Sequence, residues 1–335
     1  MMDDMQDISE LAHELSDLEL ALLLCLAGRE HCLIEATDGN ISDVAAELAL
    51  ICSHTYGLSY MVVEFSETTS SKDLHDQICI PNFQYEENGG VVGYKTVEAV
   101  IAKNFDYASE SIQLEALELM RSKKLTTPSG VLEAPEHFLL VPVVARDSGQ
   151  VRPKLVAHLN DSLLISHFHD SDDVYAYLED GQDWYSDGQS LSSVVHRTSG
   201  QDYNRHPSIE RKLLDRIHDT SNLVKVTAEL VRYQQDIVVF LRLSRAVAGG
   251  ISARSSIQLT KLAKLLAVIH GIDYLTPSIV ALAAKKVFRH RIVVAKPEDD
   301  RSLQYGSDLK AVAKVLEYAT PDTILESVLM LEAPL

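Results

Sequence analysis

Two kinds of hydrophobic pattern divide the chain into a first half of mixed elements and a second half of helices. Before residue 170, short apolar runs typical of strands alternate with stretches whose apolar residues recur every three or four positions, as on one face of a helix. The strand-like runs are 32–35, 60–65, 97–102, 138–144 and 163–168, and the helical stretches are 8–26, 42–56 and 109–123. This alternation predicts an α/β domain whose mainly parallel sheet is covered by helices.

The second half of the chain shows helical spacing almost throughout. Helices are predicted at 209–219, 227–248, 253–270, 277–288, 308–318 and 321–331. Ahead of them, residues 171–207 are rich in Asp, Ser, Gly and Tyr and carry too little apolar surface to pack tightly. We therefore predict an α/β domain at 1–170, a linker or mobile insertion at 171–207, a helical domain at 208–300 and a helical extension at 301–335.

Charge narrows the partners that this surface suits. The 335 residues carry a formal net charge of -19, which disfavours nucleic acid and anionic membranes because both require clustered Lys and Arg. The longest apolar run, 20–27, is much shorter than the ~20 residues that span a bilayer. The acidic first ten residues lack the basic and apolar regions of a signal peptide. We expect protein partners, no nucleic acid, no membrane, and a cytoplasmic location, with the nucleus as the alternative.

Three spaced elements in the helical half carry a specific resemblance. They are Gly250-Ile251-Ser252-Ala253-Arg254, then Gly271-Ile272-Asp273-Tyr274-Leu275-Thr276-Pro277, then Phe288-Arg289-His290-Arg291. Their order and spacing are similar to the lid of AAA+ ATPases of the MoxR and magnesium-chelatase I-subunit type. The resemblance implies a three-layer AAA+-like domain before an all-α lid. It also implies assembly with further copies and with partners that carry a von Willebrand A domain.

The matching phosphate-loop segment departs from the motif that binds ATP. That motif, G-x-x-x-x-G-K-[ST], supplies backbone N–H groups and a lysine to the phosphates and a hydroxyl to Mg²⁺. At the matched positions 36–43 the one glycine is Gly39, which lies between Asp38 and Asn40, while Ser42 replaces the lysine and Asp43 replaces the hydroxyl residue. A carboxylate about 4 Å from phosphate costs about 1 to 4 kcal/mol. Tight binding of ATP in the usual pose is not expected.

The second ATPase motif is also altered. After the strand at 97–102, the resemblance implies an Asp-Glu pair that holds Mg²⁺ and polarises water, but the chain has Lys103 and Asn104. Arg254 matches the arginine that opens the family's lid and contacts nucleotide; a surface arginine paired with an acidic neighbour is the alternative. The predicted vestigial nucleotide site consists of Asp38, Gly39, Asn40, Ser42, Asp43, Lys103, Asn104 and Arg254.

A histidine pair offers a different chemistry. His167 and His169 follow a predicted strand with one residue between them, a spacing at which two imidazoles can share a metal ion. Ser171 and Asp172 then stand where the H-x-H-x-D-H pattern of metallo-β-lactamase-fold hydrolases requires Asp and His. An irregular strand end is the favoured interpretation.

These patterns lead to three hypotheses about function. The first is a pseudo-ATPase of the MoxR and magnesium-chelatase type that acts as a protein-interaction or assembly module and needs no cofactor. The second is an AAA+ ATPase or chelatase-type subunit that binds ATP and Mg²⁺ in an altered mode through Arg254 and Lys103. The third is a metal-dependent hydrolase that uses His167 and His169.

Overall fold

A five-stranded parallel sheet forms the centre of the first half of the molecule. The computed structural model describes residues 2–81, 93–127, 130–146, 153–169 and 209–330. The strand order is β2-β5-β8-β1-β9, and every neighbouring pair is parallel. The strands are β1 (His31–Ala36), β2 (Tyr60–Glu64), β5 (Ala99–Lys103), β8 (Leu139–Ala145) and β9 (Leu163–Phe168). The predicted parallel sheet is confirmed.

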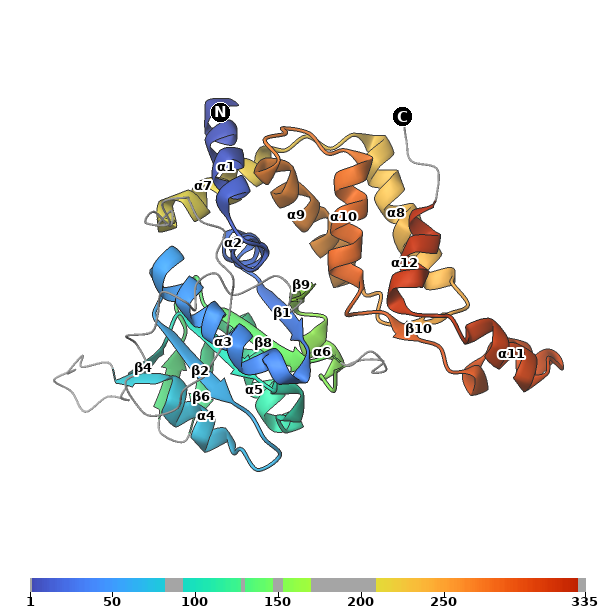
Figure 1. Cartoon of the computed structure of the whole chain (residues 1–335), viewed down its shortest axis with the longest axis horizontal. Helices are drawn as coiled ribbons and strands as arrows, with labels where there is room; N and C mark the ends of the chain where they lie inside the picture. Colours follow the sequence, from blue (N-terminus) through green and yellow to red (C-terminus); the bar gives the residue numbers. More distant parts are fainter. Residues whose placement is uncertain (1, 82–92, 128–129, 147–152, 170–208, 331–335) are drawn as a thin grey trace, which may run out of the picture.

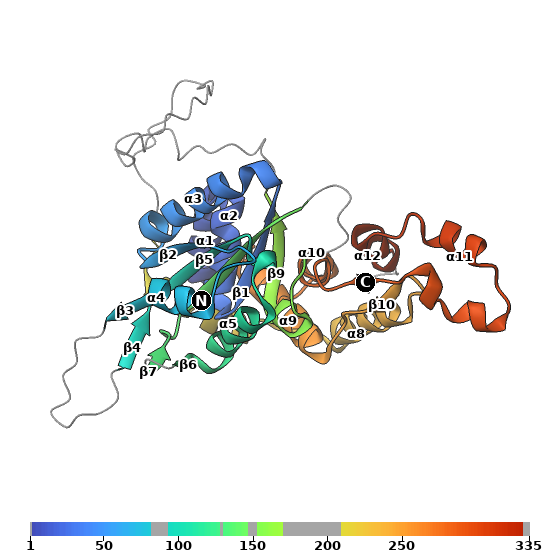
Figure 2. The same ribbon diagram turned by 90° about the horizontal axis from the view of Figure 1, so that it is seen from below.

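Helices cover both faces of this sheet and make three layers. Side chains alternate along β1: Cys32 and Ile34 enter one hydrophobic cluster and Leu33 enters the other, as the two-residue period of a strand requires. One face is covered by α2 (Asp17–Gly28) and α3 (Ile41–Leu50), and the other by α4 (Ser71–Ile78) and α5 (Glu110–Ser122). Figure 2 shows α2 and α3 above the sheet and α5 below it.

The second half is helical, as predicted, with one short ribbon. It contains α7 (Arg211–Leu223), α8 (Ala228–Leu243), α9 (Ala253–Ile269) and α10 (Pro277–Phe288), and the two-stranded ribbon of β10 (Val247–Gly249) and β11 (Val293–Val294). After the 3-10 turns Pro297–Asp299 and Arg301–Tyr305 come α11 (Leu309–Leu316) and α12 (Pro321–Leu329). The last helix returns to pack on α8 and α10, whereas α11 projects away from the sheet in both views (Figures 1 and 2).

The structure differs from the predicted elements in several places, among them α4, which was not predicted, and the helix predicted at 227–248, which ends at Leu243. Residues 8–26 form two helices, α1 (Met2–Glu14) and α2, because Ser16 starts a new helix with a capping box to Glu19. The helix predicted at 42–56 ends in a π-helical turn, Ile51–Thr55. A second sheet, order β3-β4-β7-β6, was not predicted; its strands are β3 (Cys79–Pro81), β4 (Gly93–Thr96), β6 (Lys124–Thr127) and β7 (Gly130–Glu133). The predicted linker at 171–207 lies outside the described residues.

One hydrophobic cluster joins the sheet to the lid. It includes Leu22 of α2 and Ile34 of β1 together with Leu262 of α9 and Val280 of α10. Helices α1 and α2 both contact α9, and α2 also contacts β1 and β9, while α9 and α10 contact β9 directly (Figure 1). In the described part of the chain, no helix has the length and apolar character needed to cross a membrane.

Candidate functional site

The carboxyl ends of β1 and β8 mark the expected ligand site of this sheet. From β1 the chain continues through α3 to β2 on one side, whereas from β8 it crosses through α6 (Ala157–Asn160) to β9 on the other side of β1. In open α/β sheets, ligands bind outside the strand ends where the connections diverge in this way. The backbone N–H of Arg146 donates to the Ala36 carbonyl over 2.8 Å and closes the gap between the two strand ends.

The turn that follows β1 is short and regular. Only four residues separate β1 from α3: Thr37 and one 3-10 turn, Asp38–Asn40. Anion nests use backbone in the left-handed region, but Gly39 has no positive φ and a Cβ added to it would meet nothing within 4 Å. The glycine therefore has neither of the two roles that it plays in a phosphate loop.

One acidic residue lies in the first turn of α3, at the helix terminus that follows β1. The first turn of α3 contains Asp43, and the macrodipole of the helix favours a negative charge at this end. Ser42 is exposed and adds no cation. The partial positive charge of the helix terminus is thus offset by the chain's own carboxylate.

The end of β5 carries a lysine, and an asparagine follows it, at the two positions where the resemblance implied Asp and Glu. The Lys103 ammonium lies 3.5 Å from Glu64, at the end of the neighbouring strand β2. Asn104 adopts a left-handed conformation at φ 53° and starts the 3-10 turn Phe105–Tyr107. Neither side chain supplies a carboxylate at the end of β5.

An acidic residue that the sequence analysis did not single out lies next to this position. Burial raises the pKa of Asp106, and the nearby Asp38 carboxylate raises it further. One Asp106 oxygen is buried without a hydrogen bond from the described residues. The sequence signal for this site residue was a carboxyl group two residues after Asn104. A motif search compares fixed positions only, so it does not detect a carboxylate at that offset.

A second missed group is the basic residue directly after β8. The Arg146 guanidinium donates to the buried Glu35 carboxylate over 3.0 Å and lies 5.4 Å from the centre of the Phe168 ring. Burial raises the pKa of Glu35, and the Arg146 charge opposes that rise. The edge therefore holds one rigid arginine between β1 and β9, fixed by a carboxylate and a ring.

Arg254 lies away from this edge and pairs with an acidic neighbour, the alternative considered in the sequence analysis. Its guanidinium lies 3.9 Å from Glu30, and Lys261 reaches the same carboxylate over 2.7 Å. Glu30 precedes β1, whereas the phosphate-loop positions follow it, and a six-residue strand is about 20 Å long. One nucleotide phosphate cannot contact Arg254 and Lys103 together, because Lys103 ends β5 at the other edge of the sheet.

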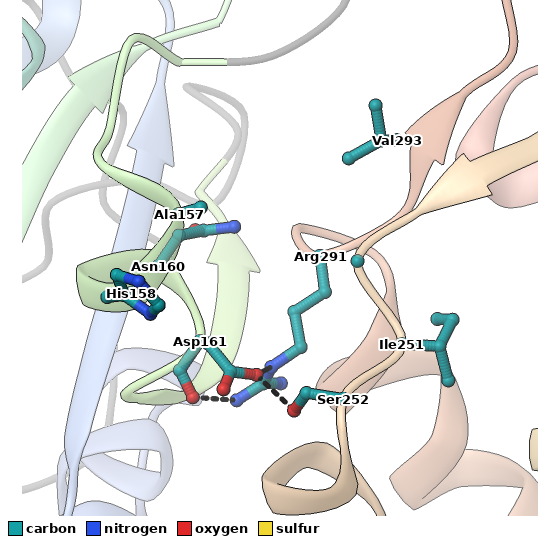
Figure 3. A pocket seen from close by; sticks show the side chains of 9 residues that line it. Ala157, His158, Asn160, Asp161, Ile251, Ser252, Arg291 and Val293 are labelled. Atoms are coloured by element: carbon teal, nitrogen blue, oxygen red, sulfur yellow. Dashed lines mark hydrogen bonds and ion pairs between the residues drawn. The ribbon is translucent and has the colours of Figure 1, made fainter.

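The lid motif instead fastens the lid to the amino end of β9. Arg291 is 1% exposed, and its guanidinium donates to the Leu163 carbonyl and to Gln258. Burial lowers its pKa to about 10, so it remains charged at neutral pH. Ser252 caps α9 and donates to Asp161 over 2.6 Å, as Figure 3 shows.

A shallow cavity of about 280 Å³ lies at this junction (Figure 3). It is lined by α6 and the turn before β9 on one side and by the strands and turns around Gly250 and Val293 on the other. Its charged walls, Asp161 and Arg291, already pair with each other at 3.6 Å. The cavity lies between the α/β half and the lid, and Asp161 on one wall pairs with Arg291 and Ser252 on the other.

The histidine pair lies in a buried polar cluster at the end of β9. Burial and the nearby Lys286 ammonium, 3.4 Å from its Nδ1, lower the pKa of His167 to about 4. His169 lies 3.6 Å from Glu47, and burial raises the pKa of Glu47 to about 7. No three metal-ligating side chains come together within the described ranges, and an ammonium beside His167 disfavours a cation there.

The comparisons with known proteins agree with the fold and with the position of the lid. A family model described as the AAA lid domain matches residues 240–311. The structure superposes on the crystal structure of a Cytophaga hutchinsonii protein, described provisionally as an ATPase, with a TM-score of 0.66 and 16% identity; the match covers 100% of this chain and 96% of the other. The chain therefore has an AAA+-like fold, with a three-layer α/β domain and a segment that matches the AAA lid, as the lid motifs predicted.

Local sequence similarity points to a second group. The chain is 31% identical over 135 residues to "Maintenance of telomere capping protein 2" of Saccharomyces cerevisiae strain S288c, which covers 38% of each chain. The protein of the same name from Lachancea thermotolerans is 32% identical over 108 residues, 31% of this chain and 38% of the relative. The Kluyveromyces lactis protein is 31% identical over 90 residues, 25% of this chain and 33% of the relative. The matches thus span little more than a third of these relatives.

Proposed function

We propose that this chain is an AAA+-like assembly module that does not hydrolyse ATP efficiently. The observation that carries the proposal is the four-residue turn 37–40, which has no left-handed backbone and leads into a helix whose first turn holds Asp43. Lys103, paired with Glu64, adds no carboxylate for Mg²⁺. The fold supplies the shape of a nucleotide site, while its surface offers carboxylates where triphosphate charge would lie.

Direct measurement of nucleotide binding and turnover tests this proposal. We expect no calorimetric binding of Mg-ATP to the wild-type chain at micromolar concentration and no phosphate release above the buffer rate at millimolar ATP. An active AAA+ ATPase measured in the same assay provides the control. Micromolar affinity or steady turnover would refute the proposal, whatever the route by which ATP binds.

We also propose that the partners of this chain are proteins. A net charge of -19 gives little attraction to DNA, so we propose that a role like that in the relatives' name would be carried by protein contacts, in the nucleus. Another copy of the chain and a protein with a von Willebrand A domain are the partners implied by the lid resemblance. Light scattering on a concentration series tests self-association, and a monomer at every concentration would remove that partner. A tagged chain confined to the cytoplasm would contradict the nuclear role.

A further inference from the structure

Two arginines from distant parts of the chain converge on one carboxylate at the carboxyl edge of the sheet. Arg146, after β8, places Nη2 3.5 Å from Asp322 Oδ2, and Arg289, after α10, places Nε 3.1 Å from Asp322 Oδ1. Asp322 lies in the first turn of α12 and is half exposed, whereas both arginines are more buried. A single exposed acidic side chain thus covers two inward-held guanidinium groups.

The Arg146 guanidinium is held rigidly by the edge. Arg146 Nη1 donates to the Glu35 carboxylate, and the Phe168 ring lies beside the guanidinium. The backbone N–H of Arg146 donates to the Ala36 carbonyl. A second guanidinium nitrogen, Nη2, lies 3.5 Å from Asp322 Oδ2. An arginine fixed in this way loses little side-chain entropy when an anion binds.

Asp322 satisfies the charge of the second arginine but not its hydrogen-bonding capacity. Arg289 Nε is a buried nitrogen that makes no hydrogen bond within the described part of the chain, although the Asp322 carboxylate lies 3.1 Å away. The contact is therefore an ion pair with poor donor alignment. A tetrahedral anion such as phosphate has more acceptor oxygens than a carboxylate, and its oxygens are not constrained by attachment to a helix.

The charges of the four side chains around Asp322 sum to zero, so this position does not attract a further anion in this conformation. Arg146 and Arg289 contribute two positive charges, and Glu35 and Asp322 contribute two negative charges. With Asp322 neutral, the same four groups carry one net positive charge, close to the end of β1. Asp322 therefore decides whether the arginine pair attracts an anion.

We propose that Arg146 and Arg289 form a binding site for a phosphate group, and that Asp322 of α12 occupies it as an internal competitor. The two guanidinium groups match phosphate geometry better than they match a single carboxylate. The site lies beside the turn after β1 but uses neither that turn nor the Lys103 position, so it goes beyond the proposed assembly role and does not require hydrolysis.

The test compares inorganic phosphate binding to the wild-type chain and to Asp322→Asn, a change that keeps side-chain shape and removes the charge. By calorimetry at constant ionic strength, we expect the variant to bind phosphate at least about tenfold more tightly, and Asp322→Asn/Arg289→Gln to lose the gain. Glu317→Gln, which removes an exposed carboxylate ahead of α12, is the matched control for net charge. Circular dichroism checks that each variant is folded.

The possible results distinguish a specific phosphate site from a general effect of net charge. Equal phosphate affinity in wild type and folded Asp322→Asn overturns the proposal, and so does an equal gain in Glu317→Gln, which would show a general charge effect. ATP without Mg²⁺ provides a second arm: tighter binding than phosphate to Asp322→Asn identifies a nucleotide phosphate as the source, and equal binding identifies phosphate alone. Wild-type Mg-ATP titration tests the proposed function, so failure of either proposal leaves the other testable.

Discussion

At the scale of single residues, two glycines near predicted motifs have opposite roles. Gly250, in the lid motif, has φ +97°, and a Cβ there would lie 1.8 Å from the Arg291 carbonyl oxygen. Gly39, in the phosphate-loop match, has ordinary φ and open space around it. The lid glycine is needed by the fold, whereas the loop glycine is not.

Substituting each glycine by alanine separates these roles. We expect Gly250→Ala to lower the free energy of unfolding by at least about 1–3 kcal/mol, because the new Cβ strains the backbone and displaces Arg291. Gly39→Ala is the matched control, and we expect it to change stability by less than about 1 kcal/mol, in the stabilising direction. Urea unfolding measures both. Comparable losses in the two variants would contradict this account.

A buried histidine makes stability depend on pH. The ring of His31, at the start of β1, accepts the Leu140 N–H over 3.0 Å, and burial lowers its pKa from 6.5 to about 3, with smaller contributions from Lys123 and Arg254. The unfolded chain therefore binds a proton first as the pH falls. The stability that neutral His31 provides is full above pH 6.5 and is lost progressively between about pH 6.5 and about pH 3.

Replacement by a neutral side chain with a donor and an acceptor tests this linkage. We expect the free energy of unfolding of His31→Gln to fall less steeply below pH 6.5 than that of the wild type, by up to about 1.4 kcal/mol per pH unit. Urea unfolding at pH 5, 6, 7 and 8 measures the difference. Parallel profiles of unfolding free energy against pH for the two proteins would show that the pKa of His31 does not differ between the folded and unfolded states.

At the scale of elements, local signals predicted most of the regular helices and the strands of the main sheet, but missed α4 and the short-range breaks. All five strands of the main sheet were expected within a few residues of their observed bounds, because each is a compact apolar run. The break between α1 and α2 follows from the Ser16 and Glu19 capping box, a four-residue signal inside a continuous apolar period. The four short strands of the second sheet carry few apolar residues, and each is stable only through its neighbours.

At the scale of the whole molecule, the lid and the sheet share one core and one buried cation. Arg291 follows α10 and donates to the Leu163 and Leu164 carbonyls at the start of β9, so it joins the lid to the backbone of an edge strand of the sheet. Asn160 adds a bond to the His290 carbonyl over 2.8 Å. The R-H-R element of the lid is therefore a clamp between the halves.

Removing this clamp should destabilise the whole chain. We expect Arg291→Met to lower the free energy of unfolding by about 3–5 kcal/mol, because carbonyl oxygens and the Asp161 carboxylate lose their buried partner. Arg232→Met removes an exposed arginine of α8, 85% exposed, and we expect a change within about 0.5 kcal/mol. Chemical denaturation compares the two, and a loss below about 1 kcal/mol for Arg291→Met would show that the clamp contributes little.

The sequence by itself determined the fold class and the positions at which residues of the ATPase motifs are replaced. Apolar periodicity depends on near neighbours, so it predicted the parallel sheet and the helical lid, and the replacement of Lys by Ser42 is visible at one position. Only the tertiary structure decided which charges meet. Arg254 pairs with Glu30 at the far edge, and Arg146 meets Asp322 from 176 residues away. Such pairs depend on how the chain closes in space, which no local pattern records.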